Sequence, residues 1–452
     1  MSEFEFQEED KREFRRKRRL RNQILAYVSL LVILAVISVG GYFGIKAISS
    51  AMEEKAQQEQ MEEALAIAEQ MQEETTEASE PTEEETIIEE ETTTEVVEEY
   101  TEEDLLNEIV ESCISEMSLE DRVAGLFMIT PEALTGVDKA VKAGDGTKEA
   151  LEKYPVGGLI YFKQNIQSKE QITDMLAKTT SMSKYPIFLG VDEEGDSIAR
   201  VAEALKLDKI DSCAKIGESG DANNAYTAYQ TVGSYLLEYG FNVNFAPVAD
   251  VLTNPDNETI GKRSFGSDAD VVSAMVASAV KGLEETGISA CMKHFPGQGD
   301  ANGDTHAGLS TTERTLEQLR ETELKPFAAG IEAGAQMIMV GHASYPSITG
   351  DNTPASLSKD IITDILREEL GYNGVVITDA LNMSAVSEYY DSATAAVMAL
   401  KAGADMVLMP EDFEAAYQGV LDAVADGTIS EARINDSLSR IYKIKYKETV
   451  DK

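Results

Sequence analysis

Short apolar runs alternate with segments of helix length along most of the chain. Continuous apolar runs of four to seven residues are typical of parallel strands that are buried on both faces. Eight such runs follow one another: Gly125–Ile129, Gly158–Phe162, Ile187–Val191, Asn242–Pro247, Ser289–Lys293, Met337–Gly341, Gly374–Thr378 and Asp405–Met409. The segments between them predict helices. Ser358 to Leu370, for example, starts with a serine suited to cap a helix and is followed by Gly371.

Eight strands that alternate with helices over about 350 residues predict an α/β fold, a (β/α)₈ barrel of the TIM type. A doubly wound open sheet is the alternative. The Gly-rich phosphate turn that usually follows the first strand of such a sheet is absent, because Ile129-Thr130-Pro131-Glu132 stands there. Further upstream, Thr101-Glu102-Glu103-Asp104 has the sequence of a capping box and predicts the start of the first helix.

A different pattern precedes the barrel. Residues 1–23 are basic, with eight Lys or Arg between Lys11 and Arg21, and Ile24 to Ile45 then runs for 22 residues without a charge. At ~1.5 Å per helical residue this run spans ~33 Å, enough for a bilayer core of ~30 Å. A cleaved signal peptide is the alternative, but its apolar region is typically ~7–15 residues. The pattern predicts a single transmembrane helix over residues 24–48 that anchors the protein in the cell membrane, with a cytoplasmic N-terminus and the remainder outside the cell.

Residues 49–102 are predicted to be an acidic linker between this anchor and a globular domain over residues 103–452. Residues 51–100 contain 19 Glu and one Lys, and they account for −18 of the total net charge of −43. Such a segment buries too little apolar surface to offset its ordering entropy, so a solvated spacer is the expected state. Binding of cations or of a basic partner is the alternative role. The negative charge argues against nucleic acid as a partner.

Polar residues follow the predicted strands at the end where a barrel carries its active groups. The third to the seventh run are followed, within three residues, by Asp192, Asp250, His294, His342 and Asp379. A cap for the next helix is an equally good explanation of Asp250 alone. Several polar residues at converging strand ends indicate a site.

Two of the three histidines of the chain lie close together in the sequence. Lys293-His294-Phe295-Pro296-Gly297 is followed by Asp304-Thr305-His306, with a Gly- and Asn-rich stretch between them. Histidine exchanges protons near neutral pH, and a carboxylate two residues before His306 can orient its ring. The three cysteines are an odd set without zinc-site spacing, so we expect mostly buried thiols at Cys113, Cys213 and Cys291.

A carboxylate at a barrel mouth can be a nucleophile, a metal ligand or a helix cap. Paired with an acid such as His306, Asp379 suits glycoside hydrolysis, which needs one group at the anomeric carbon and one at the leaving oxygen. Metal-dependent hydrolysis is the alternative, with His294, His306, His342 and a carboxylate as ligands. The lack of a His-x-His pair at any strand end weakens that alternative.

Three motifs in this order resemble glycoside hydrolase family 3, in its β-N-acetylhexosaminidase branch. They are the Lys293–His306 stretch, Gly261-Lys262-Arg263-Ser264-Phe265-Gly266, and Thr378-Asp379-Ala380-Leu381-Asn382-Met383. The resemblance covers roughly residues 104–445. It implies an exo-acting retaining hydrolase that removes terminal N-acetyl-β-glucosamine, commonly from peptidoglycan fragments, without a metal or another cofactor.

The resemblance also implies roles for individual residues. Asp379 would be the nucleophile and His306 the acid/base, with Asp304 as its partner. The residues that would surround the sugar are Asp192, Arg200, Arg263, Lys293 and His294. An ion-pair role is the plain alternative for each basic residue, above all for Arg200.

The sequence departs from the family pattern in three places. Asp196 replaces the second glycine of a common Glu-Gly-Gly motif, and Gln298 stands where histidine is common. The chain also ends about forty residues beyond the eighth run, so we expect the acid to come from the barrel's own loop rather than from a second domain. Two alternative functions keep the same residues, namely a phosphorylase and a catalytically silent protein that binds the cell wall.

Overall fold

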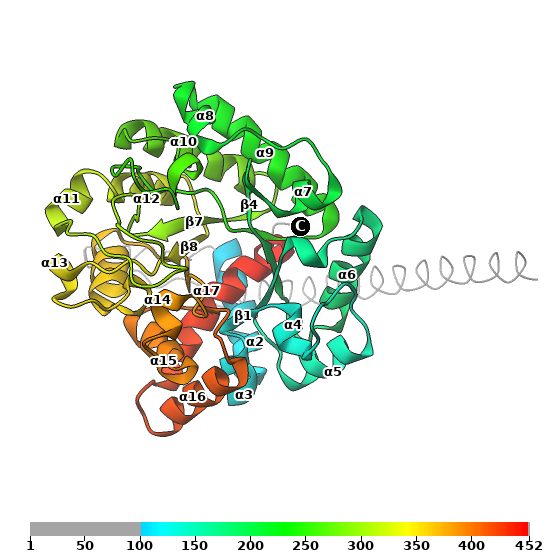
Figure 1. Cartoon of the computed structure of the whole chain (residues 1–452). Helices are drawn as coiled ribbons and strands as arrows, with labels where there is room; N and C mark the ends of the chain where they lie inside the picture. The colour runs from blue at the N-terminus through cyan, green and yellow to red at the C-terminus, as the bar shows by residue number, and fades with distance from the viewer. Residues whose placement is uncertain (1–100, 451–452) are drawn as a thin grey trace, which may run out of the picture. The chain divides into compact units, whose positions relative to one another are not determined.

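The computed structural model describes residues 101–450 (Figure 1). The predicted basic segment 1–23, the predicted transmembrane helix 24–48 and nearly all of the predicted linker 49–102 lie outside the described residues. No helix within residues 101–450 is long and apolar enough to cross a bilayer.

Eight parallel strands form the centre of the molecule, in the order β10-β1-β2-β3-β6-β7-β8-β9. Their bounds are β1 Phe127–Ile129, β2 Gly158–Tyr161, β3 Phe188–Val191, β6 Val243–Asn244, β7 Ser289–Phe295, β8 Met337–Val340, β9 Val375–Thr378 and β10 Val407–Leu408. The sheet closes where Ile377 of β9 bridges Met406, next to β10. Every strand residue is buried, as expected for strands that are covered on both faces. All eight apolar runs are therefore strands, and the predicted (β/α)₈ barrel is confirmed.

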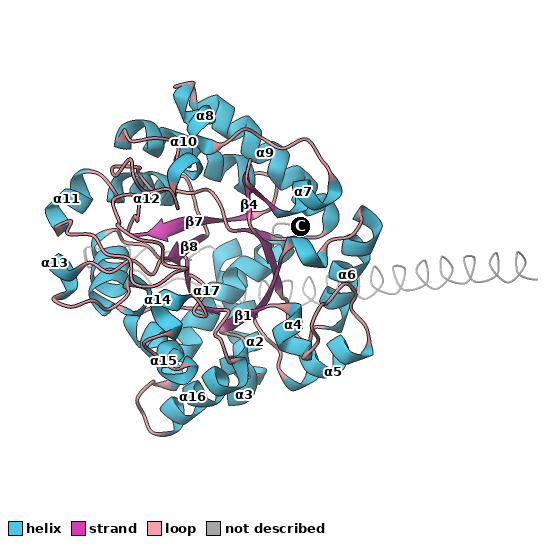
Figure 2. Ribbon diagram, viewed as in Figure 1, coloured by secondary structure: helices cyan, strands magenta, loops and turns pink. Residues whose placement is uncertain are grey.

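Helices surround the strands (Figure 2). Their bounds are α2 Glu102–Glu116, α3 Leu119–Ala124, α4 Pro131–Thr135, α5 Asp145–Lys153, α6 Lys169–Met182, α7 Arg200–Leu205, α8 Cys213–Glu218, α9 Ala222–Tyr239, α10 Ala269–Glu284, α11 Leu316–Glu321, α12 Leu324–Glu332, α13 Pro346–Thr349, α14 Ser384–Ser387, α15 Ser392–Ala402, α16 Phe413–Ala425 and α17 Glu431–Val450. Short 3₁₀ turns are η1 Lys163–Asn165, η2 Gly261–Arg263 and η3 Ala355–Leu357, and η4 Asp360–Glu369 is a π-helix. The helices α2 and α17, from opposite ends of the described chain, pack against each other.

The helix boundaries show which sequence signals act as predicted. Thr101 and Asp104 form the predicted capping box, in which each side chain accepts a hydrogen bond from the backbone N–H of the other residue. Ser358 stands at the start of the next helix, as predicted, with an extended backbone and with its O accepting a hydrogen bond from Ile362 N at 3.0 Å. No side chain makes a capping hydrogen bond at this end of η4. Gly371 follows that helix with φ +67°, as predicted for a terminating glycine.

A short hairpin after β3 did not appear in the sequence pattern. It consists of β4 Glu193–Gly195 and β5 Ile198–Ala199, which pair antiparallel at the mouth of the barrel. Asp196 occupies its turn at φ +43°, a left-handed conformation that aspartate tolerates better than most residues. The hairpin places Glu193 and Glu194 directly beside the strand ends.

Candidate active site

A cavity of about 250 Å³ lies at the carboxyl ends of the barrel strands. Seven of the eight predicted site residues line it: Asp192, Arg200, Arg263, Lys293, His294, His306 and Asp379. The eighth, Asp304, lies behind His306 and is hydrogen-bonded to it. Apolar side chains from β2, β8 and β10 complete the wall: Ile160, Met339 and Leu408.

Asp379 stands directly after β9. Its backbone N–H donates to Val340 O at 2.8 Å, and its Oδ1 accepts a hydrogen bond from Ala380 N at 2.8 Å. Burial alone would raise the pKa of Asp379, but the imidazoles of His342 and His294, together with that amide, hold the pKa below its ordinary value. The carboxylate is therefore ionised at neutral pH and held in one orientation, as a nucleophile requires.

Four charged side chains form a connected group on the opposite wall. Lys293 Nζ lies 2.7 Å from both Asp192 Oδ1 and Glu194 Oε1. Arg263 binds Glu194 through two hydrogen bonds, Nε to Oε2 at 2.8 Å and Nη2 to Oε1 at 2.9 Å. Burial would raise the pKa of Glu194, but Lys293 and Arg263 hold it well below its usual range. Glu194 is only 2% exposed, and the sequence interpretation gave it no role. Its position beside Asp192, just past a strand end, was the available signal.

His294 lies within β7, one residue inside the strand end rather than after it. Its Nδ1 is 2.8 Å from Asp250 Oδ2, and its Nε2 is 3.4 Å from Arg263 Nη2. Arginine only donates hydrogen bonds, so Nε2 is an acceptor and the ring proton lies on Nδ1, which donates to Asp250. Asp250 also accepts a hydrogen bond from Gln298 N at 2.8 Å. Asp250 thus orients His294, and the helix-cap explanation of Asp250 does not hold.

His306 and Asp304 lie on the long connection between β7 and α11. His306 Nδ1 is 2.8 Å from Asp304 Oδ1, which also accepts a hydrogen bond from His306 N at 3.0 Å. Partial burial would raise the pKa of Asp304, but the amide and the ring of His306 hold it below its ordinary value. Because Nδ1 is engaged with a carboxylate, Nε2 is the ring nitrogen left for proton transfer at the cavity.

Arg200 begins α7 and lines the cavity beside Phe162. Its guanidinium carbon lies 6.0 Å from the centre of the Phe162 ring, and its backbone N–H donates to Asp192 O at 3.3 Å. Its Nε is buried and has no hydrogen-bond partner within residues 101–450, where Arg200 also makes no ion pair. A structural ion pair therefore does not explain Arg200 in the described part of the chain.

His342 has a structural role rather than the alternative role of a metal ligand. Its two ring nitrogens lie 2.7 Å from Ser356 Oγ and 2.9 Å from Ala380 O, so both are occupied. Burial lowers the pKa of His342, and the charge of Asp379 opposes this shift. Over the whole described range, no three His, Cys, Asp or Glu side chains are grouped so as to hold one metal ion. The cysteines are unpaired thiols, of which Cys213 and Cys291 are buried and Cys113 is partly buried.

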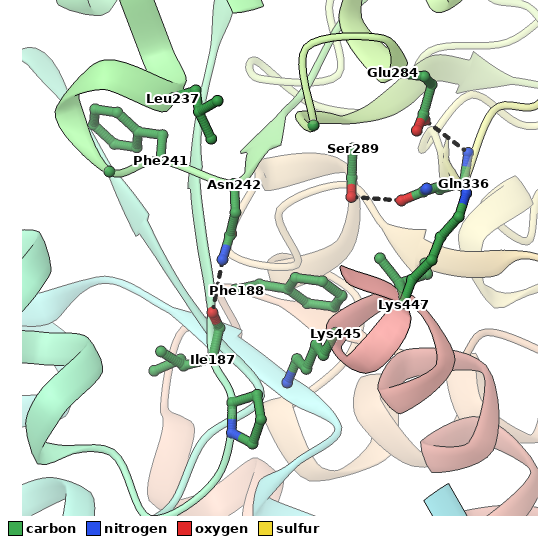
Figure 3. Close-up of a pocket in the computed structure, with 14 residues that line it drawn as sticks. Ile187, Phe188, Leu237, Phe241, Asn242, Glu284, Ser289, Gln336, Lys445 and Lys447 are labelled. Carbon is green, nitrogen blue, oxygen red and sulfur yellow. Dashed lines mark hydrogen bonds between the residues drawn. The ribbon is translucent and has the colours of Figure 1, made fainter. Parts of the chain in front are cut away.

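A larger cavity of about 640 Å³ lies at the other end of the barrel, under α17 (Figure 3). Phe188, Glu284 and Lys445 are among its lining residues, and none of the predicted site residues is. Lys445 Nζ donates to Gly157 O at 2.8 Å and lies 4.6 Å from the centre of the Phe188 ring. Active groups of (β/α)₈ barrels sit at the carboxyl ends of the strands, whereas the amino ends serve stability. The smaller cavity is therefore the candidate active site.

Comparison with known proteins agrees with this geometry. The model of the family described as "Glycosyl hydrolase family 3 N terminal domain" matches residues 118–444. The chain is 33% identical over 327 residues to beta-hexosaminidase A of Pseudoalteromonas piscicida, covering 66% of this chain and 54% of that protein. It is 34% identical over 319 residues to the beta-hexosaminidase of Stenotrophomonas maltophilia strain K279a, covering 65% of this chain and 93% of that protein.

A solved structure shows the same likeness in three dimensions. It is a glycoside hydrolase family 3 beta-N-acetylglucosaminidase from Paenibacillus sp. strain FPU-7, with a TM-score of 0.70 and 35% identity over 74% of this chain and 64% of that one. This chain thus spans about half the length of the Pseudoalteromonas relative, with 54% covered, and nearly all of the Stenotrophomonas one. The fold and the site define a barrel enzyme of the glycoside hydrolase class. The chain belongs to glycoside hydrolase family 3, in its β-N-acetylhexosaminidase branch.

Proposed function

We propose that this protein is a retaining, exo-acting N-acetyl-β-glucosaminidase. One observation carries the proposal: the ionised Asp379 carboxylate and the His306–Asp304 pair border the same cavity. The cavity of about 250 Å³ is smaller than the ~300–1,000 Å³ usual for drug-sized ligands, which suits a single terminal sugar. Relatives named beta-hexosaminidase and beta-N-acetylglucosaminidase support N-acetylglucosamine as that sugar.

The proposed reaction has two steps. In the first, Asp379 attacks the anomeric carbon, the bond from that carbon to the leaving oxygen breaks, and His306 gives its Nε2 proton to the leaving oxygen. In the second, His306 takes a proton from water, whose oxygen attacks the anomeric carbon and releases Asp379. Asp304 stabilises the charged imidazole that alternates with the neutral one.

The charged group on the opposite wall supplies sugar recognition in this proposal. Asp192 can accept hydrogen bonds from two hydroxyls, and Lys293 and Arg263 can donate to others. Burial would lower the pKa of Lys293, but Asp192 and Glu194 raise it above its ordinary value, so the ammonium remains charged when the sugar displaces water. Arg200 lines the same cavity, and its guanidinium can donate hydrogen bonds to a substrate group there.

The assay substrate for this proposal is an aryl N-acetyl-β-glucosaminide. Asp379→Ala should lower kcat by several orders of magnitude, and His306→Ala should lower it by about 10²–10⁴-fold, because acid–base assistance has that typical worth. Asp412→Ala, which removes an exposed cap on α16, is the matched control and should keep wild-type turnover. Near-wild-type turnover by Asp379→Ala would sink the proposal.

Assays with and without phosphate show whether water or phosphate accepts the sugar. A neutral histidine repels phosphate less than a glutamate would, so the His306–Asp304 pair also suits transfer of the sugar to phosphate. Hydrolysis predicts free N-acetylglucosamine as product at every phosphate concentration, whereas phosphorolysis would give the sugar 1-phosphate. Tight binding of wall fragments without any turnover would instead support a silent wall-binding protein.

We propose further that residues 24–48 anchor the enzyme in the cell membrane and that residues 49–102 hold the barrel away from it, where it acts on wall-derived saccharides. The basic residues before Ile24 and the 22 uncharged residues after them support this topology. Protease added to intact cells should then remove the barrel and leave an N-terminal fragment in the membrane. A barrel that stays protected until the cells are lysed would overturn this topology.

A further inference from the structure

The loop that carries His306 is held mainly at its base. This segment, the histidine loop, comprises residues 300–314 between β7 and α11. At its tip the His306 side chain is 64% exposed and that of Asp304 is 45% exposed. One backbone hydrogen bond, from Ala385 N to Thr305 O at 3.1 Å, ties the tip to α14. A side chain that delivers a proton must lie within hydrogen-bond reach of the acceptor, so the base of the loop has to supply much of the positioning.

Asp300 and Arg314 join the two ends of the histidine loop. Arg314 Nε lies 3.1 Å from Asp300 Oδ1, and Thr312 Oγ1 donates to Asp300 Oδ2 at 2.6 Å. Inside this pair, Asn302 and Thr311 exchange two backbone hydrogen bonds of 2.9 and 3.2 Å. The ends of the loop are therefore fixed to each other, and Ser310 and Thr312 are also bonded to the backbone of Ser344. Thr305 and His306 are the loop residues that line the cavity.

A buried carboxylate lies beneath this base. Glu323, which precedes α12, has a fully buried side chain whose Oε1 is 3.5 Å from Arg314 Nε and accepts a hydrogen bond from Thr253 Oγ1 at 3.4 Å. Gly297, just after β7, approaches so closely that an added Cβ would lie 2.7 Å from Glu323 Cβ. Arg314 thus ties the loop to α12 and to the end of β7, which are packed elements of the barrel.

The Asp300–Arg314 ion pair is less exposed than an ordinary surface ion pair. Arg320 on α11 binds Glu369 through two hydrogen bonds of 2.7 and 2.9 Å, but at 45% and 31% side-chain exposure, where solvent screens the two charges. Arg314 and Asp300 are 21% and 27% exposed, and their common neighbour Glu323 is not exposed at all. A partly desolvated network of this kind is costly to disrupt and holds its members in place.

We propose that Asp300 and Arg314 are positioning residues, which clamp the histidine loop onto Glu323 and thereby set the distance from His306 to the leaving oxygen. This inference rests on the proposed function of His306 as acid/base. Neither residue touches the cavity, so their effect has to pass through His306. Loss of the clamp should therefore lower kcat/KM most for substrates whose leaving group has to be protonated.

Two substrates separate this role from a structural one. The leaving group of N,N′-diacetylchitobiose is a sugar, whose oxygen has to be protonated by the acid. The leaving group of a 2,4-dinitrophenyl N-acetyl-β-glucosaminide is a stable phenolate, which needs no proton. Arg314→Lys and Asp300→Asn should each lower kcat/KM on chitobiose by about 10–100-fold, part of the ~10²–10⁴-fold worth of acid–base assistance. The same variants should lower kcat/KM on the dinitrophenyl substrate by less than about threefold. Azide, a nucleophile that needs no base, should raise their kcat on the dinitrophenyl substrate and give the glycosyl azide.

Arg320→Lys is the matched control, and thermal unfolding of all three variants checks that each is folded. Equal losses on both substrates in folded Arg314→Lys and Asp300→Asn would overturn the clamp, and so would the same selective loss in Arg320→Lys. If wild-type enzyme turns over neither substrate, the proposed function fails and the clamp fails with it. If His306→Ala loses activity on chitobiose but not on the dinitrophenyl substrate, while Arg314→Lys and Asp300→Asn match wild type on both, the proposed function stands and only the clamp fails.

Discussion

Two buried carboxylates, Asp250 and Glu194, hold the basic side chains of the cavity in place. Glu194 binds Lys293 and Arg263, and Asp250 fixes the ring of His294. Each of these bonds lies in a largely dry environment, where a satisfied network is strong and an unpaired member is costly. The sugar-binding side chains are therefore oriented before a substrate arrives, which reduces the entropy that binding has to overcome.

Asp250→Asn tests this orientation at a single residue. If the remaining oxygen keeps the hydrogen bond from Gln298 N, the new amide N–H faces His294 Nδ1 and drives the ring proton to Nε2, where it meets the N–H groups of Arg263. We expect kcat/KM on an aryl N-acetyl-β-glucosaminide to fall by about 10–100-fold, since charge-assisted hydrogen bonds contribute ~1.5–3 kcal/mol. Asp256→Asn, an exposed change in the following loop, should have no effect. An unchanged kcat/KM in Asp250→Asn would show that His294 does not depend on this carboxylate.

At the scale of elements, the sequence predicts the helices and strands whose formation depends on a local pattern of apolar residues. The eight strands were predictable because burial on both faces leaves mostly apolar side chains, and strand ends then placed Asp192 and Asp379 at one mouth. The β4–β5 hairpin was not, because its five strand residues carry no period and its turn uses Asp196 in place of a glycine.

Contacts between side chains on different elements could not be predicted from the sequence either. Asp250 looked like a helix cap as much as a partner of His294, since the two residues are 44 positions apart and nothing in the sequence indicates that their side chains meet. The same holds for Glu323 and Arg314, whose shared burial depends on how α12 packs under the histidine loop. Family resemblance implied the roles of Asp379, of His306 and of its partner Asp304, but it did not point to Asp250, Glu194 or Glu323.

The whole barrel divides into a chemical end with buried ionisable groups and a stabilising end with partly buried ones. At the amino ends of the strands, burial raises the pKa of Glu284 to about 7 and lowers that of Lys445 to about 7 (Figure 3). Glu284 accepts hydrogen bonds from Ala290 N and Gln336 N, and Lys445 donates to Gly157 O, so both act as structural links. Neither is near the proposed chemistry, and their titration should therefore appear in stability rather than in turnover.

The sign of each effect follows from the two shifts. Glu284 binds its proton more tightly folded than unfolded, so its contribution to stability is full below pH ~4.5 and is lost as the pH rises to about 7. Lys445 binds its proton less tightly folded than unfolded, so its contribution is full above pH ~10.5 and is lost as the pH falls to about 7. Since one pKa unit corresponds to ~1.4 kcal/mol, the full shifts correspond to about 3 kcal/mol for Glu284 and about 5 kcal/mol for Lys445, and partial exposure to solvent reduces both contributions.

Differences between variants isolate these two contributions from all other titrating groups. The free energy of unfolding of Glu284→Gln minus that of wild type should rise between pH 4.5 and 7 and stay level above, because glutamine keeps an acceptor oxygen without a charge. The difference for Lys445→Met should fall between pH 7 and 10.5 and stay level between pH 4.5 and 7. Lys142→Met, at an exposed position in the loop between α4 and α5, serves as the control and should show no such slope. Urea unfolding at fixed pH values measures all three, and parallel curves for wild type and Glu284→Gln would show that the carboxyl titrates normally in the folded barrel.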